Sequence, residues 1–455
     1  MKTKNKLLKN LYTNSLILSL PGFFSIFLSL FAIPIHLKAF GTDNYGNYLI
    51  FHIFLSLSFL LNFGISKTIV INSNRYRQLT KGIAFDGIKF TIVILFVIAL
   101  VYLFLNYIYF VDLRKYIISN ELFFLGLIIS ILYLTLEGIV QANKLFKHLS
   151  IFNFFFYSLS LSLPSISILF IKEMELVTLI FFSILIKLFL IIFLIFFLIS
   201  KGLIKKDDKS QFYKSFLKNS PWLTLNSLFV QLYEMLDKYL IKIFLGSSFM
   251  AIYSIPQQLT GKLSILSKGF SAFLLPNISN KNKNVEFFYS IDIFLKYIPL
   301  IIFLLFPFYP HLLKFWLGNE YSILIHDLTK IFSLIAIFSC ISHILLTKFE
   351  ADQLSYLNFR IEIIFLPFFL IALIYMTYAN YSLTNISLLI LIKEIVLIFF
   401  RIYFLKINYM RVKIYYIYLT SLIILLFLSF INFKLFYLIT IIILFFTFKN
   451  VKFNH

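Results

Sequence analysis

The sequence predicts an all-α polytopic membrane protein with roughly 12–14 transmembrane helices. Of its 455 residues, 61% are hydrophobic and only 13% are charged, which is far more apolar than a water-soluble protein allows. Apolar runs of roughly 17–25 residues recur along the whole chain, and each is long enough to cross a bilayer as a helix. Since no stretch between the runs is long enough for a water-soluble domain, the membrane-embedded part is expected to be the whole fold.

The expected helices are bounded by the positions at which the apolar runs give way to charged residues, Gly or Pro. The first six are expected at 14–37, 45–66, 83–108, 120–142, 150–171 and 177–200. Six more are expected at 220–245, 250–276, 289–313, 327–348, 357–378 and 384–405. A short last pair is expected at 414–431 and 435–448. If that pair is instead one re-entrant hairpin, the count is twelve plus a tail, and either count leaves both termini on one side.

Charges between the apolar runs predict the orientation of the chain, because Lys and Arg in short loops are retained in the cytoplasm. With the N-terminus inside, the cytoplasmic segments hold about 24 Lys and Arg and the outer loops about 6. We therefore expect both termini in the cytoplasm. The net charge of +22 is then a consequence of topology and does not indicate nucleic-acid binding, for which a basic stripe with interleaved aromatic residues is expected.

The longest polar interruption follows the sixth expected helix. Residues 201–218 contain six lysines and two aspartates, and they predict a basic cytoplasmic linker, either a solvated loop or a short helix at the membrane surface. The expected organisation is an N-terminal lobe at 1–200, a C-terminal lobe at 219–406 and two extra helices at 407–455.

An internal repeat supports two related lobes. The segment from Gly41 to Tyr48, before the second expected helix, resembles the segment from Gly246 to Tyr253, before the eighth, with both glycines and both tyrosines at one offset. Two parallel six-helix lobes related by an axis along the membrane normal form a known transporter plan, with the substrate site between them.

Four segments together resemble one family. They are Gly41 to Gly46, Leu61-Asn62-Phe63-Gly64-Ile65 closing the second helix, Asp237 to Gly246, and Ala251 to Pro276. Their order and spacing, with the helix count, are similar to those of the oligosaccharide repeat-unit flippases (O-antigen, capsule and teichuronic acid exporters) of the multidrug/oligosaccharidyl-lipid/polysaccharide exporter superfamily, which also contains the multidrug transporters.

The resemblance implies a V-shaped pair of lobes that moves an undecaprenyl-pyrophosphate-linked oligosaccharide across a bacterial inner membrane by alternating access. It implies a monomer without cofactors that works among membrane lipids in O-antigen, capsule or other lipopolysaccharide and polysaccharide synthesis, beside a polymerase and a chain-length regulator. One departure concerns the first helix, where relatives commonly carry arginine and this chain has Asn14, serines and His36. The anion site is therefore expected on other helices.

Polar residues inside apolar runs cost insertion free energy and therefore indicate a cavity, a partner or a function. Ser227, Gln231, Glu234 and Lys238 share one face of the seventh helix, with Asp237 beside it, and Gln257, Gly261, Ser264 and Lys268 repeat the spacing in the eighth, with Gln258 and Lys262 adjoining. We predict that Lys187, Lys238, Lys262, Lys268 and Lys296 attract the pyrophosphate and that Gln231, Gln257 and Gln258 bind sugar hydroxyls. The alternative for the seventh helix is an internal Glu234–Lys238 pair that serves packing alone.

Lys187 lies in the middle of an almost wholly apolar run and is the best single candidate in the first lobe. Glu137 in the fourth helix is expected either to neutralise it or to couple transport to an ion, a role for which Glu234 and Asp237 are the other candidates. Arg401, with Lys393 and Glu394, is expected to serve mainly as a structural anchor that snorkels to the cytoplasmic surface.

Several function classes lack their minimum parts in this sequence. There is no phosphate-binding glycine loop, nucleotide fingerprint or His-Glu-x-x-His motif, so we expect neither ATP-driven transport nor an enzyme. The single cysteine, Cys340, excludes an internal disulfide and a thiolate metal cluster. Two alternatives remain open: a multidrug or organic-cation antiporter of the same superfamily, for which an acidic cavity is expected, and a polysaccharide polymerase, for which a large outer loop is expected.

Overall fold

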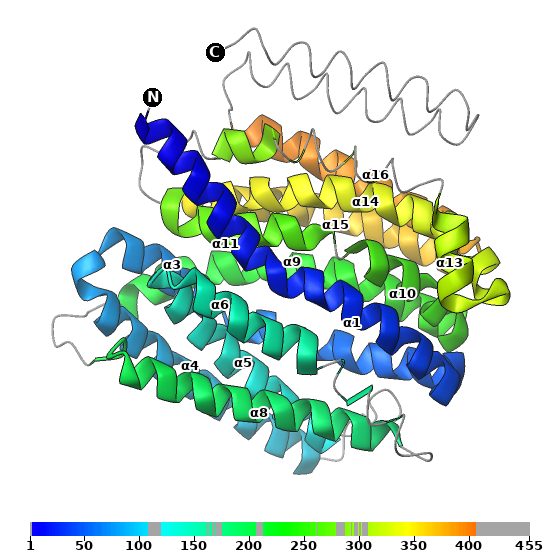
Figure 1. Cartoon of the computed structure of the whole chain (residues 1–455), viewed down its shortest axis with the longest axis horizontal. Coiled ribbons are helices and arrows are strands. Elements are labelled where there is room, and N and C mark those ends of the chain that lie inside the picture. Colours follow the sequence, from blue (N-terminus) through cyan, green and yellow to red (C-terminus); the bar gives the residue numbers. More distant parts are fainter. Residues whose placement is uncertain are drawn as a thin grey trace, which may run out of the picture.

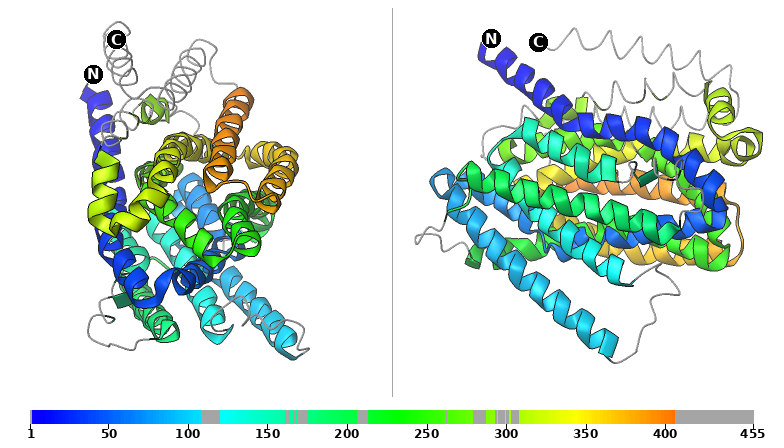
Figure 2. Two further views of the ribbon diagram at one scale, coloured as in Figure 1. Left: turned by 90° about the vertical axis from the view of Figure 1, so that its right-hand side faces the viewer. Right: turned by 60° about the horizontal axis from the view of Figure 1, so that its bottom comes forward.

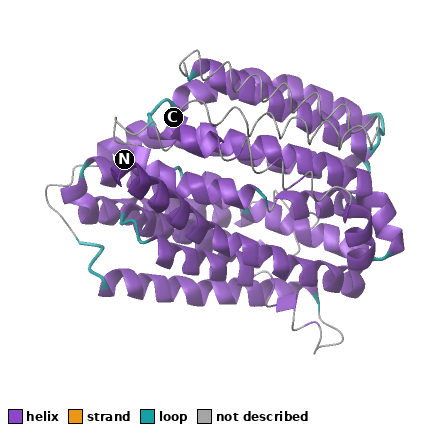
Figure 3. Cartoon of the chain, turned by 45° about the horizontal axis from the view of Figure 1, so that its top comes forward, coloured by secondary structure: helices purple, strands orange, loops and turns teal. Residues whose placement is uncertain are grey.

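The computed structural model describes residues 2–107, 120–160, 175–205, 213–261, 263–278, 287–292 and 308–405, with residues 162, 164, 165, 168, 294, 299 and 302 between them. Every secondary-structure element in these ranges is a helix, which confirms the predicted all-α class for the described part of the chain (Figure 3). The predicted last pair of helices and most of the predicted helix 289–313 lie outside the described residues, as does the middle of the basic linker.

Six described helices are long and apolar enough to cross a membrane, and they lie along one common direction (Figure 1). Three come from the first half of the chain, namely α4 (Thr80–Tyr107), whose candidate span extends from Arg77 to Phe104, α5 (Asn120–Ala142) and α8 (Leu176–Ser200). Three come from the second half, namely α14 (Asn319–Ala351), α15 (Ser355–Tyr378) and α16 (Leu383–Phe404). The protein is therefore a multi-pass membrane protein.

Large apolar side chains cover the outer surfaces of these helices, as expected where the solvent is lipid. Phe96 on α4, Phe196 on α8 and Phe368 on α15 are each more than half exposed. Helix α4 diverges from the rest of the bundle toward its Tyr107 end (Figure 2, right). Among the six, α5 and α14 have the largest buried share, and the core extends from them to α1, α3, α10 and α11.

The first two predicted helices form one long element, α1 (Lys2–Leu55), which bends at Gly41. Gly41 has φ 72° and ψ 175°, a conformation that a residue with a Cβ adopts only with strain, so the glycine permits the chain to reverse without a separate loop. Helix α1 then packs on α10 (Ser247–Gly261) and α11 (Ser264–Ile278) of the second half as well as on α6 (Phe146–Asn153) and the π-helix η3 (Phe154–Leu159).

The second predicted helix, 45–66, is interrupted instead of ending at 66. After α1 come the single turn α2 (Ser58–Leu61) and then α3 (Ile65–Arg75), separated by Phe63 and Gly64, which both have positive φ. The Asn62 side chain stabilises the interruption, since its amide donates to Thr135 Oγ1 at 2.9 Å while its oxygen accepts from the Ser66 backbone N–H. The Asn-Phe-Gly segment is thus a break within the helical path, and the prediction that it closes the second helix is wrong.

The eighth predicted helix, 250–276, is also divided, because α10 ends at Gly261 and α11 begins at Ser264. The Ser264 hydroxyl donates to the Gly261 carbonyl at 2.6 Å, which satisfies an acceptor at the end of α10. The predicted common face from Gln257 to Lys268 assumed one regular helix, so that prediction is wrong.

The bundle has two distinct ends. At the end where α3, α5 and α14 terminate, exposed basic residues gather, and we call this the basic end: Arg75, Arg77, Lys81, Lys144, Lys147, Lys201, Lys205 and Arg360. At the far end, α1 bends at Gly41, α9 (Tyr213–Phe244) stops, and the short helix α13 (Tyr309–Leu317) precedes α14 (Figure 1).

Candidate functional site

Lys187 is the most isolated charge in the first half of the chain. It is only 8% exposed, in the middle of α8, and its ammonium lies 5.2 Å from the centre of the Phe156 ring. Among the residues that the structure describes, it forms no ion pair. The ring centres of His52 and Tyr48 are 4.5 Å apart, and His52 lies within electrostatic range of Lys187. Within the described ranges, the ammonium therefore lies over one aromatic ring and has no counter-ion.

Glu137 belongs to a separate hydrogen-bonded group. Its carboxylate accepts from Asn153 Nδ2 at 3.0 Å and from the Tyr157 hydroxyl at 3.3 Å. Tyr133 donates to the Asn153 oxygen at 2.6 Å, which fixes the orientation of that amide. The possibility that Glu137 neutralises Lys187 is thus not realised in this structure.

Asp237 is a buried carboxylate of the second half, with 1% exposure on α9. It accepts from the Tyr253 hydroxyl at 2.8 Å, from the Lys238 backbone N–H at 2.7 Å and from Gln257 Nε2 at 3.5 Å. The structure therefore brings together three of the predicted site residues, Asp237, Lys238 and Gln257. Tyr253, which belongs to the sequence repeat, is the fourth member.

The charges near the end of the second half are paired inside the protein. Arg401 is 4% exposed and forms an ion pair with Glu362, while its Nε donates to Asn358 Oδ1 at 2.9 Å. Lys393 pairs with Glu394 at 2.8 Å and lies 4.3 Å from the Tyr233 ring centre. The prediction that Arg401 snorkels to the surface is wrong, since Glu362 and Asn358 on α15 supply its partners internally.

The remaining predicted residues are dispersed. Gln258 hydrogen-bonds Tyr45, so it joins α10 to α1. Lys268 on α11 is exposed. The side chains of Gln231, Glu234, Lys262 and Lys296 lie outside the described residues.

The two halves of the chain meet at both ends of the bundle. At the far end, Ser248 Oγ donates to Asp43 Oδ1 at 2.6 Å, and Lys242 Nζ donates to Asn47 Oδ1 at 2.9 Å. At the basic end, Lys67 of α3 forms an ion pair with Glu350 of α14, and Gln141 Nε2 donates to the Ala272 carbonyl at 2.7 Å. This conformation is therefore bridged on both sides.

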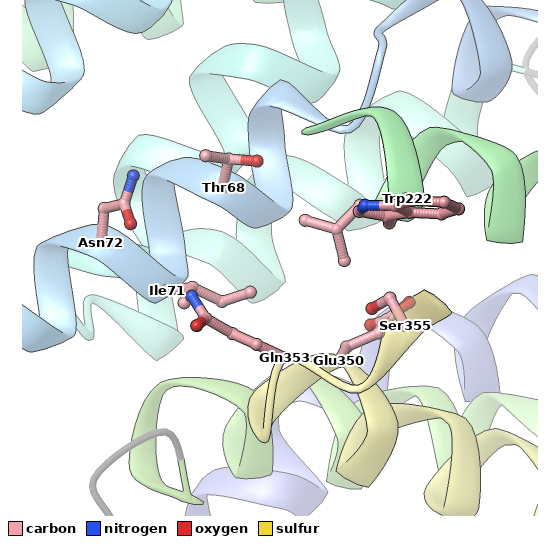
Figure 4. A pocket seen from close by; sticks show the side chains of 8 residues that line it. Thr68, Ile71, Asn72, Trp222, Glu350, Gln353 and Ser355 are labelled. Carbon is pink, nitrogen blue, oxygen red and sulfur yellow. The ribbon is translucent and has the colours of Figure 1, made fainter. Parts of the chain in front are cut away.

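A cavity of about 30 Å³ lies beside the Lys67–Glu350 pair (Figure 4). Its walls come from α3, α9 and the turn between α14 and α15, and they consist of Thr68, Ile71, Asn72, Trp222, Leu223, Glu350, Gln353 and Ser355. In the described part of the chain, no group of His, Cys, Asp and Glu side chains is arranged to hold a metal ion.

Sequence reasoning assigned no role to four ionisable residues inside the bundle: His36, Glu350 and Glu362 are buried, and His52 is half-buried. His36, which lies 2.9 Å from Ser165 Oγ, and His52 are on α1, where a lone histidine in an apolar run looks like ordinary packing. Glu362 follows Arg360 in what looks like the polar start of a helix. The ion pair between Glu362 and Arg401 can be recognised only when the positions of their two helices relative to each other are known. A single sequence does not give those positions.

Comparison with solved structures identifies the fold. An outward-facing multidrug resistance MATE family transporter of the MOP superfamily aligns over 88% of this chain and 95% of its own, with a TM-score of 0.65 and 12% identity. A MOP superfamily transporter from Pyrococcus furiosus gives a TM-score of 0.66 at 11% identity, over 88% of this chain and 95% of its own. The Vibrio cholerae MATE transporter VcmN in its bent form gives 0.63 at 14% identity, over 88% of this chain and 96% of its own.

The sequence matches no protein-family model and shows no significant similarity to a curated protein. At such low identity the structural likeness establishes the fold and not a particular substrate. These neighbours are transporters, and the likeness to them shows that this chain has a MATE-like helical fold.

Proposed function

We propose that this protein is a flippase that moves an undecaprenyl-pyrophosphate-linked oligosaccharide from the cytoplasmic to the outer leaflet of a bacterial inner membrane. It would do so as a monomer, by alternating access between an N-terminal and a C-terminal six-helix lobe. In this proposal the basic end faces the cytoplasm, because basic loops are retained there. The exported repeat units would then serve a polysaccharide polymerase and a chain-length regulator in O-antigen or capsule synthesis.

Lys187 carries the proposal. A cation in the middle of a membrane helix is costly unless it is paired or functional, and Lys187 has no ion pair in the described part of the chain. Placed over Phe156 near His52, it offers a positive charge in a low-dielectric setting, where attraction to a pyrophosphate is strong. A transporter of organic cations gains nothing from such a group.

Within this fold, the charge of the binding pocket is a criterion for distinguishing an anionic cargo from a cationic one. For the Pyrococcus furiosus transporter, a reversed polarity of the binding pocket is reported to suggest a different function. By the same physical logic, a buried cation at Lys187 with no carboxylate partner among the described residues favours an anionic cargo over a cationic drug.

A multidrug or organic-cation antiporter is the second candidate, and Asp237 and Glu137 favour it. Asp237 is buried and Glu137 is half-buried, and both carboxylates accept hydrogen bonds from neutral tyrosine and amide groups. In a flippase, the same carboxylates would couple transport to an ion.

Complementation of a flippase-deficient strain that carries the matching glycan genes tests the proposal. We expect the wild type to restore surface glycan and Lys187→Met to lose it at equal membrane abundance. Lys201→Met, at the exposed end of the same helix, is the matched control and should behave as wild type. Failure of the wild type together with drug resistance in its host would favour the antiporter. If the lipid-linked units are flipped normally and only their polymerisation is absent, the result would favour the polysaccharide polymerase as the function of this protein.

A further inference from the structure

The cavity at the basic end has the side-chain chemistry of a polar ligand site. Figure 4 shows Thr68 and Asn72 of α3 on one side of the cavity, Gln353 of the turn after α14 and Ser355 at the start of α15 on another, and Trp222 of α9 on a third. Amide and hydroxyl groups with one indole face are suited to a sugar, whose hydroxyls form hydrogen bonds and whose ring packs on an aromatic surface.

The carboxylate that lines this cavity has a cationic partner from the other half of the chain. Glu350 lines the cavity, is 4% exposed, and forms an ion pair with Lys67. The Lys67 side chain is 35% exposed, whereas that of Glu350 is 5% exposed. One buried carboxylate therefore holds one accessible cation across the junction between α3 and α14.

The size of the cavity defines what this conformation accepts. A cavity needs roughly 10–15 Å³ to hold one water molecule, so about 30 Å³ holds about two and excludes a sugar. Separation of α3 from α14 would widen it, and that separation breaks the Lys67–Glu350 pair. Lys67 is then left without its counter-ion at the moment when the site opens.

We propose that Lys67 exchanges partners, binding Glu350 when the basic end is closed and the pyrophosphate of an entering lipid-linked sugar when it is open. The Trp222 side of the cavity receives the first sugar. Glu350 and the cargo pyrophosphate therefore compete for the ammonium group of Lys67. When no cargo is present, Lys67 binds Glu350 and keeps the basic end closed. This inference rests on the flippase proposal, because it names where that cargo is first held.

If Lys67 exchanges partners, substitutions of Lys67 and of Glu350 should change the affinity for a pyrophosphate ligand in opposite directions. The probe is geranyl pyrophosphate, added to the full-length protein in lipid nanodiscs. Trp222 fluorescence reports binding in a Trp316→Phe background, since the chain has two tryptophans. We expect Glu350→Gln to bind the probe about tenfold more tightly, because competition for Lys67 is removed, and Lys67→Met to bind it about tenfold more weakly. The double variant should bind as weakly as Lys67→Met.

A nearby ion pair provides the matched control. Lys348 and Asp352 also lie at the basic end, 2.9 Å apart, but they belong to the end of one helix and do not join the two halves. Asp352→Asn removes the same charge as Glu350→Gln and should leave the affinity unchanged. An equal gain in both variants would mean that only the general surface charge matters, which overturns the exchange. Equal affinity for inorganic pyrophosphate would overturn the assignment of a prenyl-linked cargo.

The outcomes separate this inference from the proposed function. If the wild type restores surface glycan but Glu350→Gln and Lys67→Met both weaken probe binding, the pair is merely structural and the exchange is wrong while the flippase stands. If the wild type neither restores glycan nor binds the probe, the proposed function fails and the exchange with it.

Discussion

Asp43 and Ser248 are separated by 205 residues in the sequence, and their side chains form a 2.6 Å hydrogen bond at the far end of the bundle. The same offset, 205, relates Gly41 to Gly246, and both glycines have positive φ. Two equivalent positions of a repeat touch each other only where the axis relating the repeats passes between them, as in a two-fold interface. Such a contact is expected from the two-lobe plan, which stays a prediction.

The offset of 205 also relates polar groups deeper in the bundle. Asn153 corresponds to Asn358, and Tyr157, which donates to Glu137, corresponds to Glu362, which pairs with Arg401. Glu137 and Glu362 both have polar partners, but they lie on different helices, α5 and α15. The second half neutralises its carboxylate with Arg401, whereas the described partners of Glu137 are neutral.

The far-end contact predicts a cross-link. In a Cys340→Ser background, Asp43→Cys with Ser248→Cys should form a disulfide in most molecules under mild oxidation, because the native side chains meet at hydrogen-bond distance. The cross-link should stop transport, and reduction should restore it. Each single-cysteine variant is the control. Oxidised protein that transports at the wild-type rate would show that the far end does not open.

The buried ion pair predicts a loss of stability. Arg401→Met leaves Glu362 without its counter-ion and should lower the free energy of unfolding by about 3–5 kcal/mol. The double variant Arg401→Met/Glu362→Leu should recover most of that loss, because it removes both charges together. Thermal unfolding in detergent, followed by retention of monodisperse protein, measures the effect. A double variant that is less stable than the single one would contradict this account.

The contact between α1 and α11 depends on a glycine. A Cβ at Gly269 would lie 2.2 Å from Ser19 Oγ and 2.8 Å from the Ser15 carbonyl, so Gly269→Val should push the helices apart and reduce folded protein in the membrane severalfold. Gly261→Val is the control, because nothing lies within 4 Å of a Cβ there. Similar membrane abundance of the two variants would show that the close approach is unnecessary.

Helices within uninterrupted apolar runs could be predicted from the sequence. The predicted spans 120–142 and 177–200 agree with α5 and α8 to within a residue, because hydropathy alone determines where a helix crosses lipid. The breaks at Phe63 and Gly261 could not be predicted in the same way. They depend on backbone angles and on a tertiary hydrogen bond from Asn62 to Thr135, while the surrounding residues remain apolar.

The sequence predicted which charged residues are buried in the candidate site, but it predicted only some of their partners. Lys187 and Asp237 stand out because charge is rare in apolar runs, and both are buried as that rarity implies. The partner of Glu137 was not predictable, because hydropathy does not fix the rotation of α5 relative to α8. Its real partners, Asn153 and Tyr157, are neutral residues without a conspicuous sequence signal.

The nature of the cargo is the central claim, and transport by the purified protein tests it most directly. Proteoliposomes would contain either an undecaprenyl-pyrophosphate-linked oligosaccharide, with outer-leaflet exposure followed by lectin binding, or ethidium, with movement followed by fluorescence. We expect the wild type to translocate the lipid-linked oligosaccharide, Lys187→Met to reduce the rate at least about tenfold, and Lys201→Met to leave it unchanged. Movement of ethidium with no translocation of the oligosaccharide would contradict the flippase proposal.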